Sequence, residues 1–170
     1  IFDDVKLRWL NGEYLKAMTD DEFYQVAKDW ITSSKVGESF DNRVIAQLLR
    51  TRVEVLNEIP DKINFLAEFG EYDSELFFHK KSKTDKEVAI KLLPSLIECV
   101  SGLESFDHDT IYNALAELAT RLEIKAASLF WVFRIALTGQ AVTPGGAVEM
   151  AVVLGKEESL NRLSFSMEYL

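Results

Sequence analysis

Arginine side chains are the residues in this sequence best suited to binding chemistry. Arg50 and Arg52 lie two positions apart in the stretch Leu49-Arg50-Thr51-Arg52-Val53. A guanidinium carries paired, planar donors that suit phosphate oxygens and nucleobase edges, and it can also stack on a base. An arginine here has a plainer alternative, because an exposed Arg52 can simply pair with Glu54 or Glu58 along a helix.

A second candidate region runs from Arg134 to Leu163. Arg134 lies near the end of an apolar helical run, and we expect Thr143-Pro144 to open the next helix, since threonine caps helices and proline is tolerated in their first turn. Such a corner exposes backbone N–H groups that a ligand can approach. Burying an arginine is costly unless it is paired, so Arg134 should reach the mouth of a cavity or bind a carboxylate such as Glu149. A plain capping turn is the alternative for the corner.

Charge and composition limit the classes of function. The 170 residues include 19 basic and 28 acidic side chains, a net charge of −9, whereas a stand-alone nucleic-acid binder is usually basic. One cysteine, Cys99, excludes an internal disulfide and a thiolate zinc cluster. No apolar run approaches the roughly 20 residues of a membrane span, and the first residues do not resemble a signal peptide. We therefore expect a cytoplasmic protein with no membrane partner.

Helices should position these arginines. Only three prolines and eight glycines are present, and apolar residues recur mostly at spacings of three and four, which predicts an all-α fold. Thr19 and Glu22 form a capping-box pattern, and Asp107 or Asp109 should cap a later helix. We expect an interruption of the first helix at Asn11-Gly12, an end or bend at Ile59-Pro60, and a central helix that is apolar on most sides over residues 125–137. The other expected helices cover residues 23–31, 44–56, 61–69, 84–100, 107–122, 143–154 and 156–170.

Two motifs carry a family resemblance. Residues 136–163 follow the pattern A-L-T-G-x-x-x-T-P-G-x-x-x-E-x-x-x-x-L-G-K-E-x-x-L-x-R-L, and residues 2–19 read FDDVKLRWLNGEYLKAMT. Both resemble the C-terminal part of bacterial glutamyl-tRNA synthetases, in the order and spacing of that family. The resemblance implies a helical bundle or cage with a stem-contact segment at residues 1–60, an anticodon-binding helical domain at residues 61–170, and a monomer.

The resemblance also implies roles for individual residues. Arg52 matches the second arginine of the family's R-x-R element, which reads the last anticodon base and separates glutamate from glutamine codons. Val53 departs from the aromatic residue frequent in the family, and Gly146 departs from a larger apolar residue. The residues implied in contacts with the anticodon or its backbone are Arg50, Arg52, Arg134, Thr143, Pro144, Gly146 and Lys156, and Arg162 is a further candidate for a phosphate contact.

The catalytic motifs of that family are absent from this sequence. A glutamyl-tRNA synthetase attaches glutamate to tRNA(Glu) using ATP on a nucleotide-binding domain with HIGH-like and KMSKS-like motifs. Lys80-Lys81-Ser82-Lys83 mimics the second of these, but it follows the opening motif instead of preceding it, which favours a solvated loop. We therefore expect no catalytic residue, no metal and no cofactor in this chain, with ATP bound by the catalytic domain of a parent enzyme.

The expected partners are the anticodon loop and inner stem of tRNA(Glu) and the parent's own catalytic domain, against which Trp9 should pack. The alternative function is a helical protein-interaction scaffold that holds a basic partner without binding RNA, which the acidic composition favours. His79 and His108 lack neighbours in the sequence that suggest catalysis or metal binding.

Overall fold

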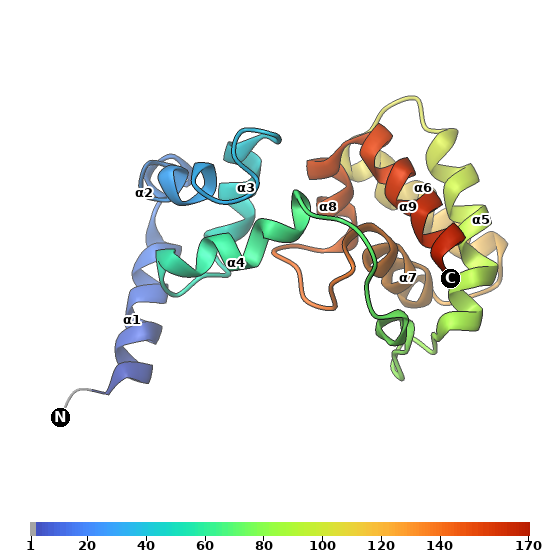
Figure 1. Ribbon diagram of the computed structural model, residues 1–170, viewed down its shortest axis with the longest axis horizontal. Helices are drawn as coiled ribbons and strands as arrows, with labels where there is room; N and C mark the ends of the chain where they lie inside the picture. Colours follow the sequence, from blue (N-terminus) through green and yellow to red (C-terminus); the bar gives the residue numbers. More distant parts are fainter. Residues whose placement is uncertain (1–2) are drawn as a thin grey trace. The chain divides into compact units, whose positions relative to one another are not determined.

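The computed structural model describes residues 3–170, which form two compact units, residues 3–68 and Phe69–Leu170. The expected division after residue 60 falls inside helix α4, Ile59–Ile63, and the structural division comes after Glu68. Helices make up both units, and within residues 3–170 the only β-type pairing is an isolated bridge between His79 and Thr84. The predicted all-α class is confirmed (Figure 1).

The first unit packs short helices around a small apolar core. Its helix α2 contacts α3, α4 and the 3₁₀ turn η1, while α1 extends away from them (Figure 1). Phe23, Ala27 and Ile31 of α2 are fully buried at the spacing of one helical face. The elements are α1 Asp4–Ala17, α2 Asp20–Thr32, α3 Asn42–Leu49, η1 Leu56–Glu58, α4 Ile59–Ile63 and η2 Asn64–Leu66.

Local sequence explains most ends of these helices. Thr19 Oγ1 accepts from the amide of Glu22, and the Glu22 carboxylate accepts from the amide of Thr19, so the predicted capping box is confirmed. Two predictions were wrong. Helix α3 ends at Leu49 and does not continue to residue 56, and Pro60 lies in the first turn of α4 and does not end a helix. Proline suits a first turn because its missing N–H has no helical partner there.

The predicted interruption at Asn11-Gly12 was also wrong, because α1 is continuous through both residues. Gly12 is buried although the rest of its helix is mostly exposed. A Cβ at position 12 would lie 3.2 Å from Cγ and 3.4 Å from Cα of Glu54. The glycine therefore permits a close approach between α1 and the segment around Glu54.

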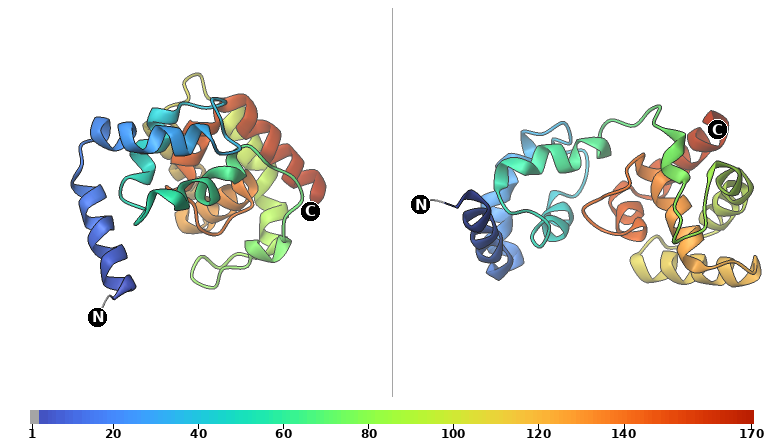
Figure 2. Two further views of the ribbon diagram at one scale, coloured as in Figure 1. Left: turned by 60° about the vertical axis from the view of Figure 1, so that its left-hand side comes forward. Right: turned by 90° about the horizontal axis from the view of Figure 1, so that it is seen from below.

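The second unit is built around α7, which contacts α5, α6, α8 and α9 (Figures 1 and 2). Most of α7 is buried, as predicted for a central helix. Asp107 caps α6, and Gly139 ends α7 in the left-handed conformation at φ 62°. Pro94 lies inside α5 without ending it. The elements are η3 Ser74–Phe77, α5 Lys86–Ser101, α6 His108–Arg121, α7 Ala126–Thr138, α8 Ala147–Leu154 and α9 Lys156–Tyr169.

The expected start of a helix at Thr143-Pro144 was wrong. Helix α8 begins at Ala147, and Gly146 takes the N-cap position without a side-chain hydrogen bond. Thr143 Oγ1 instead donates to the carbonyl oxygen of Gly145 at 2.6 Å. Thr143 and Pro144 therefore form a turn before the helix, and the threonine closes that turn.

Candidate nucleic-acid interface

Arg52 lies in the loop between α3 and η1, at the edge of a polar cavity of about 280 Å³. Its side chain is exposed, and Nη1 donates to the carbonyl oxygen of Leu48 at 2.7 Å in the last turn of α3. A cation suits that position because helix C-termini leave carbonyl groups without helical partners. The cavity is lined by Lys16, Thr51, Arg52, Val53, Glu54, Glu58 and Lys62.

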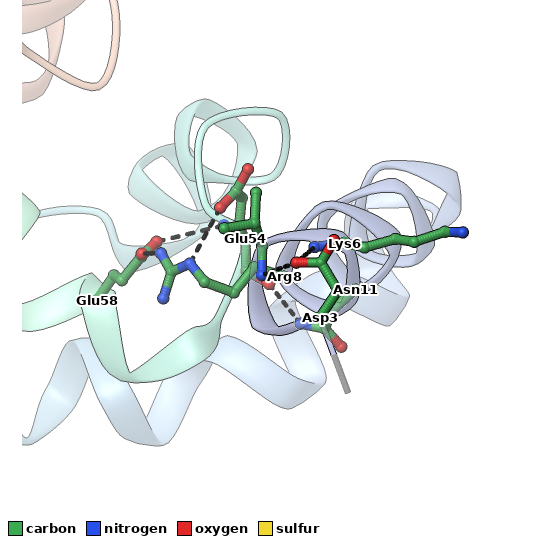
Figure 3. A network of polar contacts seen from close by, with 7 residues as sticks. Asp3, Lys6, Arg8, Asn11, Glu54 and Glu58 are labelled. Atoms are coloured by element: carbon green, nitrogen blue, oxygen red, sulfur yellow. Dashed lines mark hydrogen bonds and ion pairs between the residues drawn. The ribbon is translucent and has the colours of Figure 1, made fainter. Parts of the chain in front are cut away.

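Both glutamates of this cavity pair with Arg8 (Figure 3). Arg8 Nε lies 3.3 Å from Glu54 Oε2, and Arg8 Nη2 donates to Glu58 Oε1. Within residues 3–170, Arg52 forms no ion pair. The plain alternative of an Arg52–glutamate pair is therefore not what the structure shows.

The charge of Arg8 alters the titration of its partner. Burial by itself raises the pKa of Glu58, but the hydrogen bond and charge of Arg8, together with the amide of Glu54, outweigh it and hold that pKa below its ordinary value. The amide of Glu54 lies 3.3 Å from Glu58 Oε2. Glu58 is thus held in its ionised form by groups other than Arg52.

Residues of α1 and its C-terminal end form hydrogen bonds with the chain both before and after Arg52. After Arg52, the Asn11 side chain donates to the carbonyl oxygen of Glu54, next to the close approach at Gly12 (Figure 3). Before Arg52, the Arg50 guanidinium donates to the carbonyl oxygens of Lys16 at 2.6 Å and Met18 at 3.2 Å. Arg50 also pairs with Asp20 at 2.9 Å. Arg50 therefore holds the junction of α1 and α2 in place, two residues before Arg52.

Arg134 lines a different cavity, of about 330 Å³, within the second unit. Its Nη1 donates to the carbonyl oxygen of Ala141 at 3.2 Å, and its guanidinium carbon lies 5.8 Å from the ring centroid of Trp131. No carboxylate of residues 3–170 forms an ion pair with it. Of the two predicted outcomes, the structure shows the first: Arg134 reaches a cavity. The lining is His108, Tyr112, Ala127, Phe130, Trp131, Arg134, Gly146, Ala147, Val148 and Glu149.

Aromatic rings form much of the wall of this cavity. Tyr112 and Phe130 lie 5.3 Å apart between centroids, and His108 stacks near Tyr112 at 6.2 Å. Trp131 is fixed by its Nε1 donating to the carbonyl oxygen of Leu76 at 3.0 Å and by stacking on His79 at 4.0 Å. A flat wall with a cationic rim offers a place for an unstacked base.

Gly146 leaves room in this cavity for a carboxylate. A Cβ at position 146 would lie 2.7 Å from Glu149 Oε2, so the glycine permits Glu149 to fold back over the start of α8. His108 Nε2 lies 3.9 Å from Glu149 Oε1. The space that a larger residue at position 146 would fill is therefore taken by an acceptor group.

The remaining predicted contact residues lie elsewhere in the second unit. Pro144 is buried, and Thr143 is half-buried in the turn that leads to Gly146. Lys156 Nζ donates to the carbonyl oxygen of Leu103 at 2.6 Å. Arg162 is only 3% exposed, with Nε donating to Glu158 at 2.8 Å and the guanidinium 4.6 Å from the ring centroid of Phe69, and burial lowers its pKa. Arg162 is therefore a core residue.

Sequence reasoning missed Arg8, Asn11 and the aromatic wall. Arg8 and Asn11 were visible only as part of a motif, and their partners lie more than 40 residues away in the sequence.

No group of His, Cys, Asp or Glu within the described residues is arranged to hold a metal ion. None of the helices in residues 3–170 has the length and apolar character required to cross a membrane.

The chain that contains these two cavities matches a known class of domain. The family model described as "Anticodon binding domain" matches residues 8–167, nearly the whole chain. The chain belongs to this family.

Curated relatives that match the full chain are glutamate–tRNA ligases. The one from Clostridium acetobutylicum is 36% identical over 170 residues, and the one from Clostridium botulinum strain Eklund 17B is 40% identical over 172 residues. The match covers 100% of this chain and 35% of each ligase, so the chain spans about a third of the length of these relatives.

Solved structures share the fold. A glutamate tRNA ligase from Elizabethkingia meningosepticum, in complex with its amino acid, superposes on 96% of this chain with a TM-score of 0.78 and 22% identity. A glutamate-tRNA synthetase from Elizabethkingia anophelis gives the same TM-score over 98% of this chain with 23% identity. The superposed region is 32% of each of those chains.

Proposed function

We propose that this chain binds and discriminates the anticodon of tRNA(Glu) as the C-terminal part of a glutamate–tRNA ligase. The observation that carries the proposal is that Arg52 and Arg134 each line a cavity and that neither forms an ion pair with a carboxylate of residues 3–170. An arginine held without an acidic partner retains donors for a ligand. Membership of the anticodon-binding family supplies the class of ligand.

Arg52 is the residue to which we assign discrimination. Glutamate codons begin with G and glutamine codons with C, so the third anticodon base is cytosine for glutamate and guanine for glutamine. Cytosine presents O2 and N3 as adjacent acceptors, which a donor-only guanidinium can bind, whereas the same edge of guanine presents N–H donors. Lys16, Lys62, Glu54 and Glu58 also line the Arg52 cavity, so most of its lining side chains are charged.

We assign another anticodon base to the cavity of Arg134. Tyr112, Phe130 and Trp131 provide surfaces on which an unstacked base can lie, and Arg134 and Glu149 provide a donor and an acceptor for its edge. The turn containing Thr143 and Pro144 leads directly into the Gly146 side of this cavity. In this proposal, Lys156 and Arg50 contribute less, because neither side chain lines either cavity and Arg50 already pairs with Asp20.

The wider proposal concerns the parent enzyme. We propose a cytoplasmic, monomeric ligase that uses ATP in a separate catalytic domain to attach glutamate to tRNA(Glu). Helix α1 supports a contact with such a domain, because its apolar residues are exposed to an unusual degree. These are Val5 at 76%, Leu7 at 44%, Trp9 at 57%, Leu10 at 58% and Tyr14 at 69%.

The test is the affinity of this chain for two tRNAs that differ only in the third anticodon base, C or G. We expect Arg52→Gln to reduce the preference for C by about 1–3 kcal/mol, the range for one good paired base contact. Arg43→Gln is the matched control, because Arg43 belongs to the same unit but pairs with Asp21 at 3.0 Å. An unchanged preference in Arg52→Gln would remove the assignment, and equal loss in both variants would indicate a general charge effect.

A further inference from the structure

The two carboxylates of the Arg52 cavity are bound by another arginine, Arg8, which does not line that cavity. Glu54 and Glu58 line the same cavity as Arg52, and both follow it closely in the sequence. Within residues 3–170, Arg8 is the one side chain that forms an ion pair with either glutamate. Arg8 comes from α1, so a distant segment determines which arginine these carboxylates bind (Figure 3).

The geometry of the Arg8 guanidinium explains why it binds both glutamates. Its Nε reaches Glu54 and its Nη2 reaches Glu58, so a single planar guanidinium binds both carboxylates. The backbone of Glu54 is held in the same region. Asn11, which lies on α1 like Arg8, donates to the carbonyl oxygen of Glu54, and the amide of Glu54 donates to the carboxylate of Glu58. Lys6, on the same helix, extends away from both glutamates (Figure 3).

Without Arg8, the two carboxylates would be unpaired in a partly shielded cavity that Arg52 also lines. Their side chains are 49% and 25% exposed, so their attraction for a nearby cation is only partly screened by water. Lys16 already pairs with Glu13 at 3.0 Å, whereas the charge of Lys62 acts on Glu58, so Lys62 and Arg52 are the two cations of the cavity that the freed carboxylates would attract. Arg52 would then be drawn to an internal partner.

We propose that Arg8 is a positioning residue for anticodon discrimination: it binds Glu54 and Glu58 and so keeps the Arg52 guanidinium available to the third anticodon base. This inference rests on the proposed function of Arg52. It differs from a purely mechanical role for Arg8, in which the ion pairs merely attach α1 to the loop. The two roles predict different results when Glu54 and Glu58 are replaced by glutamine in the Arg8 variant. Only the positioning role predicts that the preference for C is restored.

The test compares variants of the 170-residue chain in binding to the same two tRNAs, with C or G as the third anticodon base. We expect Arg8→Met to lower the preference for C by about two- to five-fold, as expected from redirecting an exposed ion pair. Adding Glu54→Gln and Glu58→Gln to Arg8→Met should restore the preference, because no carboxylate would then compete for Arg52. Lys6→Met removes the same charge from the same helix and should leave the preference unchanged.

Each outcome separates the inference from the proposed function. If Arg52→Gln has no effect on the preference, the assignment of Arg52 fails and the inference fails with it. If Arg52→Gln acts but Arg8→Met does not, or if the triple variant stays as poor as Arg8→Met, only the inference is overturned. Should Arg8→Met fail to fold, Arg8→Lys serves instead: it retains the charge but lacks the separated planar donors with which Arg8 reaches both carboxylates, and the same rescue by the two glutamines must be seen.

Discussion

The two arginine sites are held in place by different physical means. Arg134 lies on α7 and lines a cavity with aromatic walls. Its neighbours in the sequence, Phe133 and Ile135, are fully buried. Arg52 projects from a loop that exposed polar contacts with α1 hold in place. We infer that the Arg134 site is rigid and favours stacking, while the Arg52 site depends on charges and is open to adjustment.

The difference predicts which changes matter most for the fold. Arg162 lies within the second unit's core, where its guanidinium donates to Glu158 and to the carbonyl oxygen of Leu137 at 3.2 Å. We expect Arg162→Ala to destabilise this unit by about 2–5 kcal/mol, because truncating the buried side chain leaves a cavity and removes the donor to the carbonyl oxygen of Leu137. Chemical denaturation followed by circular dichroism measures this. A loss below about 1 kcal/mol would show that the buried arginine is not structural.

Stacking in the Arg134 cavity should have the next largest effect. Tyr112 is 49% exposed, so Tyr112→Ala should leave the fold intact while removing one wall of the cavity. We expect tRNA affinity to fall by about 1–3 kcal/mol, the range for one stacked base. Phe78→Ala is the control, since Phe78 is an exposed aromatic of the same unit that does not line this cavity. Equal affinities for the two variants would contradict a base-stacking role.

The smallest expected effect is on the pH dependence of the first unit. The pKa of Glu58 is lowered in the folded state, so its contribution to stability is complete above the unfolded pKa of about 4.3 and is lost as the pH falls through the folded value. In Arg8→Met the pKa of Glu58 should rise, because the opposing effect of burial remains. Nuclear magnetic resonance titration of the Glu58 side-chain carboxyl carbon measures this, and an unchanged pKa would mean that Arg8 does not interact with Glu58 in solution.

Local patterns predicted the helices, and distant contacts were the part that could not be predicted. The Thr19–Glu22 capping box and the Asp107 cap of α6 depend on neighbouring residues, and both predictions were confirmed. The prediction at Asn11-Gly12 was wrong because these residues serve a close approach to Glu54, which lies in another segment. A glycine permits both a turn and a close packing contact, and the sequence alone does not distinguish them.

The site shows the same division. The family resemblance pointed to Arg52 and Arg134, and the structure places both at cavities. Arg8 was not predicted, since its partners lie 46 and 50 residues along the chain. The sequence showed Gly146 in place of a larger apolar residue, but it did not show that Glu149 folds into the space beside this glycine. Such replacements depend on side-chain directions that helical periodicity does not give.

The central claim is that an unpaired Arg52 binds the third anticodon base, and the coupling free energy between the two tests it most directly. Four dissociation constants suffice, from the unchanged chain and Arg52→Gln with tRNAs carrying C or G at that base. We predict a coupling of about 1–3 kcal/mol in favour of arginine with cytosine. A coupling of zero within error, with all four complexes formed, would contradict the account.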